Sequence, residues 1–303
     1  MKDRILRLNL YIGLGILGCS AVLLGFEVYF IKTWFFSLAW WSFILIMDSL
    51  NYRKSGNSPL SGPFHEFLFM IFISVFVWLV FELFNLRLNN WSYHGLPESL
   101  FLRWLGYFIA FATVMPAMRE ISLFAGSLLK HKKLALFRLR PTPVLLKGSL
   151  VFGIVCIGLV IIWPRAFFPL TWLCFIFLLE PLNIWLGNES YVKDMDRKDW
   201  ARFWSWVWAG LVAGILWEFW NFWASSHWVY HLPYLDFWRL FQMPVFGYTG
   251  FLPFALEVFA FYHISLSLYR KLKGKVFLKC VIFVLLLFAY AGAFFLIDKF
   301  TLK

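Results

Sequence analysis

The stretch FELFNLRLNNWSYHGLP at 81–97 returns as WEFWNFWASSHWVYHLP at 217–233. Each version places a glutamate and, three residues later, an asparagine inside an apolar run: Glu82 and Asn85, then Glu218 and Asn221. Side chains three apart share one face of a helix. A Trp-x-Tyr-His segment and a Leu-Pro pair follow in both versions. The stretch therefore predicts two copies of one helical unit.

Two further blocks repeat in the same order around this stretch. Pro116 and Glu120 match Pro253 and Glu257, and the segment 48–51 (Asp-Ser-Leu-Asn) matches 180–183 (Glu-Pro-Leu-Asn). We expect four parts: a first four-helix repeat at 1–133, a basic linker at 134–144, a second four-helix repeat at 145–272, and a ninth helix at 273–303. Because each copy has an even number of helices, both should insert the same way up, as a parallel repeat.

The composition indicates a membrane protein. Apolar residues make up 62% of the chain, its mean hydropathy is +0.73, and it contains 38 Phe and 18 Trp. A soluble domain is closer to half apolar. The net charge of +12 lies mostly in short loops between apolar runs, so membrane topology explains it better than nucleic-acid binding does.

The apolar runs predict an all-α fold of about nine transmembrane helices, since each crossing needs roughly 20 apolar residues. They are expected near 9–30, 33–50, 65–87, 105–129, 145–163, 167–187, 203–225, 249–269 and 276–297. The segment 235–247 is expected to be interfacial or re-entrant. Basic residues gather at the N-terminus and in every second loop. The positive-inside rule then predicts a cytoplasmic N-terminus and an outside C-terminus in a cell's inner membrane.

Four glutamates inside the expected helices are the main candidates for function: Glu82, Glu120, Glu218 and Glu257. Ionisable groups in a bilayer are costly and mark functional sites or interhelical contacts. At 1.5 Å per residue, Glu218 and Glu257 each lie roughly 10 Å below the outer surface, so we expect them to line one apolar cavity. The competing interpretation is that these acids hold helices together by hydrogen bonds.

Other polar groups are weaker candidates. His94, His227 and His231 would suit a metal together with Glu218, but the spacing in a loop is weak evidence and a surface role explains them better. The acidic loop at 188–199 would suit Mg²⁺ and a diphosphate, but lysine and arginine interleave with its acids. The four cysteines form no CxxC pair. We therefore predict no metal and no cofactor.

The repeated motifs resemble the lycopene cyclase domain of the small membrane-embedded carotenoid cyclases. Trp217-Glu218, then Trp228-Val229-Tyr230 with Pro233, then Pro253 to Phe261 with Glu257, look like that family's three motif elements. The first copy carries weaker versions at 82, 91–97 and 116–124. Glutamate replaces the family's aspartate, and each copy has one acid where the family has two. The nine-helix layout is also similar to the intramembrane prenyltransferases (the UbiA superfamily), although the first cytoplasmic loop lacks their aspartate cluster.

This resemblance implies an isomerase-like enzyme of carotenoid or isoprenoid biosynthesis that protonates a polyene or prenyl lipid. The four glutamates would be catalytic, and these residues would bind substrate: Asn85, Asn221, Trp217, Trp228, Tyr230 and Phe261. Burial keeps a carboxyl protonated, and aromatic faces stabilise a carbocation. A proton- or ion-coupled transporter, an intramembrane prenyltransferase and a non-catalytic scaffold remain alternatives. The expected partner is a lipid from the bilayer, and the sequence leaves the oligomeric state open.

Overall fold

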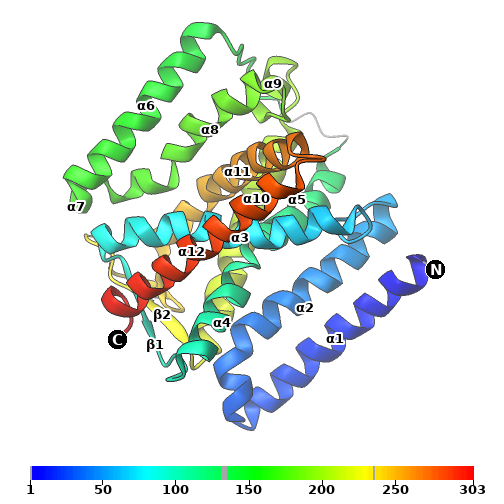
Figure 1. The fold of residues 1–303 in the computed structure, drawn as a ribbon, viewed down its shortest axis with the longest axis vertical. Coiled ribbons are helices and arrows are strands. Elements are labelled where there is room, and N and C mark those ends of the chain that lie inside the picture. The colour runs from blue at the N-terminus through cyan, green and yellow to red at the C-terminus, as the bar shows by residue number, and fades with distance from the viewer. Residues whose placement is uncertain (1, 131–134, 235) are drawn as a thin grey trace.

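The computed structural model describes residues 2–130, 135–234 and 236–303, with side chains from residue 8 onward. The described chain is mostly helical, which confirms the all-α class (Figure 1). The long helices are α1 (Lys2–Gly25), α2 (Tyr29–Ser55), α3 (Phe64–Leu88), α4 (Leu100–Phe111), α5 (Val114–Leu129), α6 (Pro143–Ile162), α8 (Cys174–Trp185), α10 (Ala201–Trp223), α11 (Phe251–Lys271) and α12 (Val276–Phe300). The short elements are α7 (Pro164–Phe167), η1 (Phe168–Trp172), α9 (Tyr191–Asp196), η2 (Val245–Gly250), β1 (Trp91–His94), β2 (His227–Tyr230), β3 (Arg239–Leu240) and β4 (Met243–Pro244).

Eight helical segments of the described chain are long and apolar enough to cross a membrane. The chain is therefore a multi-pass membrane protein by the length and composition of its helices. The sequence predicts about nine spans, and the segment outside the eight is α10, which coincides with the expected run 203–225. Its 23 residues are enough for a crossing, but tryptophan, glutamate and asparagine side chains lower its mean hydropathy.

The expected single helix at 105–129 is broken into α4 and α5. Ser74 of α3 lies at the break, where its Oγ donates to the Phe111 carbonyl at 2.7 Å and accepts from the Met115 N–H at 3.0 Å. Backbone groups freed at a break in lipid need such partners. A helix pattern read from apolar residues alone does not reveal this break, because the run stays apolar through it.

The expected helix at 167–187 is also broken, into α7, η1 and α8. Pro164 and Pro169 begin the first two of these segments. Proline lacks an N–H and cannot sit inside a regular helix without losing a hydrogen bond. The segment that the predicted repeat aligns with it, α2, runs through 27 residues without a break. The two aligned segments therefore differ.

Strands β1 and β2 pair antiparallel and join the two repeated stretches. The register sets Trp91 opposite Tyr230 and Tyr93 opposite Trp228. Each Trp-x-Tyr segment thus meets the other in the reverse direction. Residues 301–303 lie along the other edge of β1, where the Tyr93 N–H donates to the Thr301 carbonyl at 2.8 Å. The segment expected to be interfacial forms the β3–β4 hairpin and η2 before α11.

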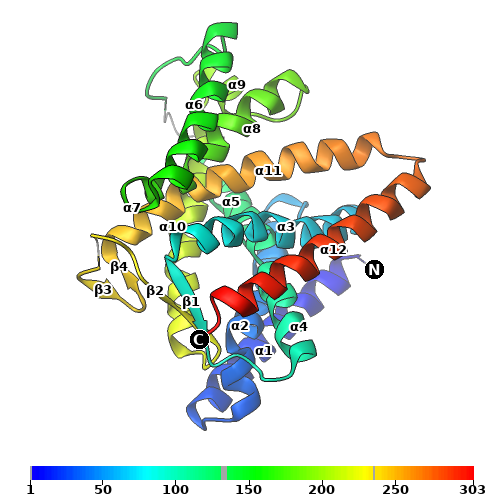
Figure 2. The ribbon, with the colours of Figure 1, turned by 60° about the vertical axis from the view of Figure 1, so that its left-hand side comes forward.

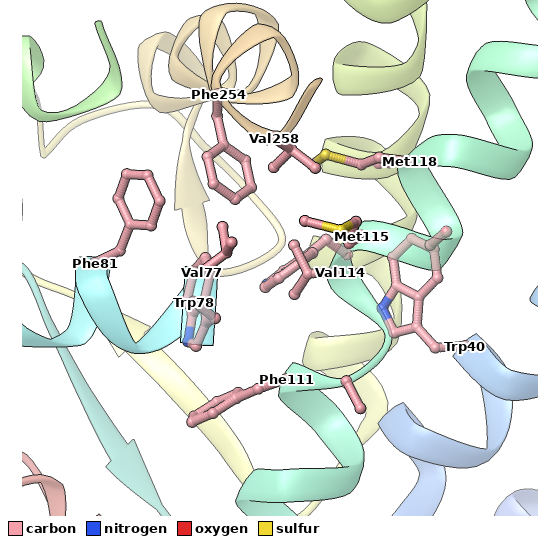
Figure 3. Packing of buried hydrophobic residues seen from close by; sticks show 14 of the residues in the cluster. Trp40, Val77, Trp78, Phe81, Phe111, Val114, Met115, Met118, Phe254 and Val258 are labelled. Carbon is pink, nitrogen blue, oxygen red and sulfur yellow. The ribbon is translucent and has the colours of Figure 1, made fainter. Parts of the chain in front are cut away.

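The helices form a central group with a helical pair at each end. α1 with α2 and α6 with α8 occupy opposite ends of the view, and α3, α5, α10 and α11 lie between them (Figure 1). Figure 2 shows the β1–β2 ribbon beside the C-terminal end of α12. The core between the central helices is aromatic and methionine-rich, and it includes Trp78, Phe254 and Met115 (Figure 3).

Part of the predicted linker lies outside the described residues. This part is residue 134, and Lys132 and Lys133 at the end of the first predicted repeat are also outside the described set; the described part of the linker leads from residue 135 into α6. The side chains of Lys2, Arg4 and Arg7, on which the orientation argument partly depends, are likewise outside the described set.

Candidate functional site

A pocket of about 230 Å³ lies where β1 and β2 meet η1, η2 and the start of α11. Its walls are largely aromatic, and its aromatic lining residues are Trp78, Trp91, Tyr93, Phe168, Trp172, Trp228, Tyr230, Phe246, Phe251 and Phe254. We call this cavity the aromatic pocket. Apolar walls with few polar groups are typical of small-molecule sites. The pocket draws its walls from both repeated stretches.

Tyr230 brings a polar group to the aromatic pocket. Its Oη donates to Glu218 Oε1 at 2.8 Å, and Glu218 is fully buried in α10 directly behind it. The second oxygen, Glu218 Oε2, has no hydrogen-bond partner in the described part of the chain. Burial and the charge of Glu218 raise the pKa of Tyr230 well above its ordinary value, so the phenol keeps its proton.

Tyr93 repeats this arrangement on the neighbouring strand. Its Oη donates to Oε1 of Glu82, a buried residue of α3. The same oxygen accepts from the indole N–H of Trp78 at 2.8 Å and of Trp91 at 3.1 Å. Glu82 Oε2 also lacks a partner among the described groups. Each repeated stretch therefore sets a tyrosine on the pocket wall and a glutamate behind it.

The two predicted substrate-binding asparagines hold the strands instead of facing the pocket. Asn85 Nδ2 donates to the Trp91 carbonyl at 2.9 Å, and its Oδ1 accepts from the Trp91 N–H at 3.1 Å. Asn221 makes the same pair of bonds to Trp228, at 2.9 and 3.0 Å. Both amides are fully buried. They fix each Trp-x-Tyr segment over its own glutamate.

A smaller cavity of about 70 Å³ lies next to the aromatic pocket, and the two share part of their aromatic walls. Trp78, Tyr93 and Trp228 line both cavities, and Trp217 lines only the smaller one. Arg103 and Tyr107 of α4 also line it, and Asp298 of α12 holds both: it accepts two hydrogen bonds from Arg103 at 2.8 and 3.0 Å and one from the hydroxyl of Tyr107 at 2.9 Å.

Glu257 lies away from Glu218, at the start of α8. Its Oε1 accepts the backbone N–H of Phe175 at 2.9 Å, and the carboxyl also faces the N–H of Ile176. These are N–H groups of the first turn of α8, which have no partner within the helix. The aromatic pocket's lining includes neither Glu218 nor Glu257, so it differs from the shared cavity expected around them.

Glu120 and Phe261 also lie outside the pocket wall. Glu120 Oε2 accepts from Asn51 Nδ2 at 2.6 Å, and its carboxyl pairs with that of Asp48. Phe261 packs against Phe175, with ring centroids 4.9 Å apart. Of the ten predicted site residues, Trp228 and Tyr230 line the aromatic pocket directly, and Glu82 and Glu218 support its tyrosines.

The weaker candidates form ordinary polar contacts. Ser92 Oγ bonds Nε2 of His94 at 3.0 Å and of His231 at 2.8 Å, and the ring of His227 stacks on His94. Burial and the neighbouring His227 lower the pKa of His94; burial and Lys303 lower that of His231. Within the described ranges, no three His, Cys, Asp or Glu side chains come close enough to hold a metal ion.

The acidic loop is held by arginines. Arg202 bridges Glu189 and Asp194, and Arg138 reaches Asp196 at 2.8 Å. These contacts occupy the carboxylates that a metal-diphosphate site would need.

The sequence does not identify several residues of the site. Tyr93 follows from the repeat, since it matches Tyr230, but Trp78 and Trp172 come from segments without a repeated motif. Asp298 lies in a helix outside the repeat, and its only signal is a charge near the end of an apolar run. Comparison of the chain with protein-family models, with curated proteins and with solved structures finds no match.

Proposed function

We propose that the chain spans the membrane nine times, with α10 as the additional span, as two parallel four-helix copies and a final helix. The matched contacts of Asn85 and Asn221, and the reciprocal register of β1 and β2, support this layout. The N-terminus would be cytoplasmic and the C-terminus outside. Reporter fusions at residue 303 and within 135–142 should report opposite sides; the same side for both would contradict the layout.

We further propose that the protein is an intramembrane enzyme that performs acid catalysis on an unsaturated apolar lipid, in the manner of a lycopene cyclase-like isomerase. One observation carries the proposal: Tyr230 lines an aromatic pocket while its hydroxyl is bonded to the buried carboxyl of Glu218. Tyr93 and Glu82 supply a second pair of the same kind. The substrate would be a polyene or prenyl chain drawn from the bilayer.

In the proposed reaction, the Tyr230–Glu218 pair gives one proton to the substrate and later takes one proton back. When Glu218 is protonated, its O–H donates to the Tyr230 oxygen, and the phenol O–H turns into the pocket. The alkene π electrons form a C–H bond with that phenol proton, the carboxyl proton passes to the tyrosine oxygen, and a carbocation is left on the adjacent carbon. Loss of a proton from a neighbouring carbon, back through Tyr230 to the carboxylate, forms the new double bond. The sum is an isomerisation. If a second double bond of the same chain attacks the carbocation before the proton is lost, a carbon–carbon bond forms and the sum is a cyclisation. Neither reaction needs an oxidant or a cofactor.

The pocket walls suit the intermediate of such a reaction. Indole and phenyl faces attract a cation, as the rings of Trp172, Trp228 and Phe254 would here. An apolar wall also excludes the water that would trap a carbocation.

The test combines product analysis with two isosteric variants. Lipids extracted from membranes containing the full chain are analysed by mass spectrometry, against cells lacking it. Tyr230→Phe and Glu218→Gln should each lower conversion by about a hundredfold or more, within the range for a general acid. Tyr290→Phe is the matched control, because Tyr290 is a buried tyrosine bonded to the Phe72 carbonyl at 2.8 Å, away from the pocket.

The outcome separates the enzyme from the transporter. Full conversion by both isosteric variants would contradict the proposed relay. Proton uptake into liposomes that depends on Glu218, with no change in any lipid, would favour a proton-coupled transporter instead.

A further inference from the structure

A third cavity, of about 660 Å³, lies between α6, α8, α9 and the start of α10. Leu146, Phe152, Phe177 and Trp204 are among its apolar lining residues, and Glu180 and Tyr191 bring polar groups to it. We call it the α6 groove. Among the described residues, none lines both this groove and the aromatic pocket. Its volume lies inside the range of about 300–1,000 Å³ common for ligand sites.

Two buried polar atoms in the groove lack partners. Glu180 and Tyr191 leave only 3% and 4% of their surfaces exposed. Glu180 Oε1 accepts from Ser190 Oγ and from the Val192 N–H, but Oε2 bonds to no described group. The hydroxyl of Tyr191 is equally without a partner in the described ranges. A buried polar atom left unpaired costs about 1–3 kcal/mol, so each one calls for an explanation.

The first copy holds an acid of the same kind in a similar backbone contact, and it also has one oxygen without a donor among the described groups. Asp48 occupies the position of Glu180, and its Oδ1 accepts the N–H of Leu60, twelve residues later, at 2.8 Å. Val192 likewise follows Glu180 by twelve residues. What distinguishes Asp48 is that its carboxyl lies next to that of Glu120, although Asp48 Oδ2 and Glu120 Oε1 have no donor among the described groups.

The corresponding acid pair in the second copy is separated. Glu257, which matches Glu120, accepts the Phe175 N–H at the start of α8. Glu180 therefore keeps one oxygen without the carboxyl partner that Asp48 has. That oxygen belongs to a lining residue of a large apolar cavity.

We propose that the α6 groove binds a single-chain lipid whose head is an uncharged hydroxyl, with the hydroxyl bonded to Glu180 and Tyr191. The hydroxyl donates one hydrogen bond and accepts another, so it satisfies the carboxylate oxygen and the phenol together. A buried carboxylate repels an anionic head, which excludes fatty-acid anions and phosphates from this position. The apolar walls take the chain, and α6 is open to lipid, with Val151 61% exposed.

Photolabelling tests the site in the full chain, reconstituted in lipid nanodiscs. The probe is a long-chain alcohol with a diazirine in its tail, and the labelled peptides are mapped by mass spectrometry. We expect labels on residues 145–152 and 200–204. Unlabelled 1-dodecanol should compete at a concentration about tenfold or more below that of dodecyl methyl ether, which cannot donate a hydrogen bond.

Three variants separate the contributions of the Tyr191 hydroxyl, the Glu180 carboxyl and the open space of the groove to lipid binding. Tyr191→Phe should raise the competing dodecanol concentration about five- to tenfold, the value of one net hydrogen bond. Glu180→Leu should remove the preference for alcohol over ether. Gly148→Leu should block labelling by filling the groove, since a Cβ at Gly148 meets no atom within 4 Å. Tyr262→Phe, on α11 outside the groove, is the matched control and should change nothing.

Three results would overturn the proposal: equal competition by alcohol and ether, labels confined to other segments, or full labelling of Gly148→Leu. If Glu180→Leu does not fold, Tyr191→Phe and Gly148→Leu still decide the question. The α6 groove does not depend on the proposed chemistry. If Tyr230→Phe loses conversion but is still labelled in the α6 groove, the result supports the proposed catalysis and shows that lipid binding in the groove does not depend on it.

Discussion

Replacing Glu257 tests whether its carboxyl stabilises the start of α8 or supplies a proton to a substrate. The structure favours the first role, because Glu257 is fully buried and its Oε1 accepts the Phe175 N–H at 2.9 Å. Glu257→Leu removes that acceptor and leaves a buried donor unpaired, at about 1–3 kcal/mol. It also removes a carboxylate from a helix N-terminus, which adds about 0.3–1 kcal/mol. Glu257→Gln keeps an oxygen in place and should lose about 1 kcal/mol or less.

Cys174 offers a local probe of this effect. It is the first residue of α8 and is fully buried, whereas Cys19 and Cys280 are exposed and can be replaced by serine. Opening of the first turn exposes the Cys174 thiol to a maleimide in detergent solution. A loss of about 2–3 kcal/mol corresponds to roughly 30- to 150-fold faster alkylation in Glu257→Leu. Glu257→Gln should stay within about fivefold of the parent.

The matched control is the acid of the other copy. Glu120→Gln changes a buried glutamate that bonds to Asn51, and it should leave Cys174 alkylation unchanged. Unchanged alkylation in Glu257→Leu would refute the stabilising role. Loss of conversion in Glu257→Gln with parental alkylation would instead make Glu257 catalytic, as the sequence motif predicts.

Three further predictions concern stability. Asp298→Ala should lower the free energy of unfolding by about 1.5–3 kcal/mol, because it leaves the partly buried Arg103 without its charged hydrogen-bond partner; denaturant unfolding in micelles measures this, and a change under 1 kcal/mol would contradict it. Ser74→Ala should cost about 1–3 kcal/mol and speed hydrogen exchange at the α4–α5 break, while parental exchange there would contradict the bridging role. Because burial and nearby positive groups lower the pKa values of His94 and His231, unfolding takes up protons below about pH 6.5. Stability should fall from pH 7.5 to pH 5.5, and the fall should shrink when both are replaced by glutamine; an unchanged pH dependence in that variant would exclude these histidines.

The sequence predicts the helical fold class because apolar runs report on it directly, but it does not predict that the repeated Trp-x-Tyr segments pair as strands. The repeat also identified Glu82 and Glu218, and with them the Trp-x-Tyr segments that line the pocket. Depth along a helix is a poorer predictor of which side chains share a cavity. Glu218 and Glu257 are expected at equal depth, but depth does not fix the direction in which a side chain points around its helix.

The breaks in the helices were the main feature that the sequence pattern did not reveal. The break between α4 and α5 depends on Ser74, a residue of another helix, so no local signal marks it. The break before α8 has a local signal in Pro164 and Pro169, yet the partner that caps α8 comes from α11. Such contacts arise from tertiary packing, which hydropathy does not encode.

Under the proposed repeat, that second break accounts for the main differences between the two copies. In the first copy α2 is unbroken, and the cavity lined by its early residues holds about 70 Å³. In the second copy the prolines divide the matching segment, and its η1 residues line a pocket of about 230 Å³. The freed start of α8 takes Glu257 as its acceptor, which leaves Glu180 without the carboxyl partner that Asp48 keeps. One local change in sequence thus accounts for a larger aromatic pocket, a structural role for a conspicuous acid, and an unpaired acid in a second groove. For this reason we place the chemistry at Tyr230 and Glu218 of the second copy, with the first copy supplying the opposite wall.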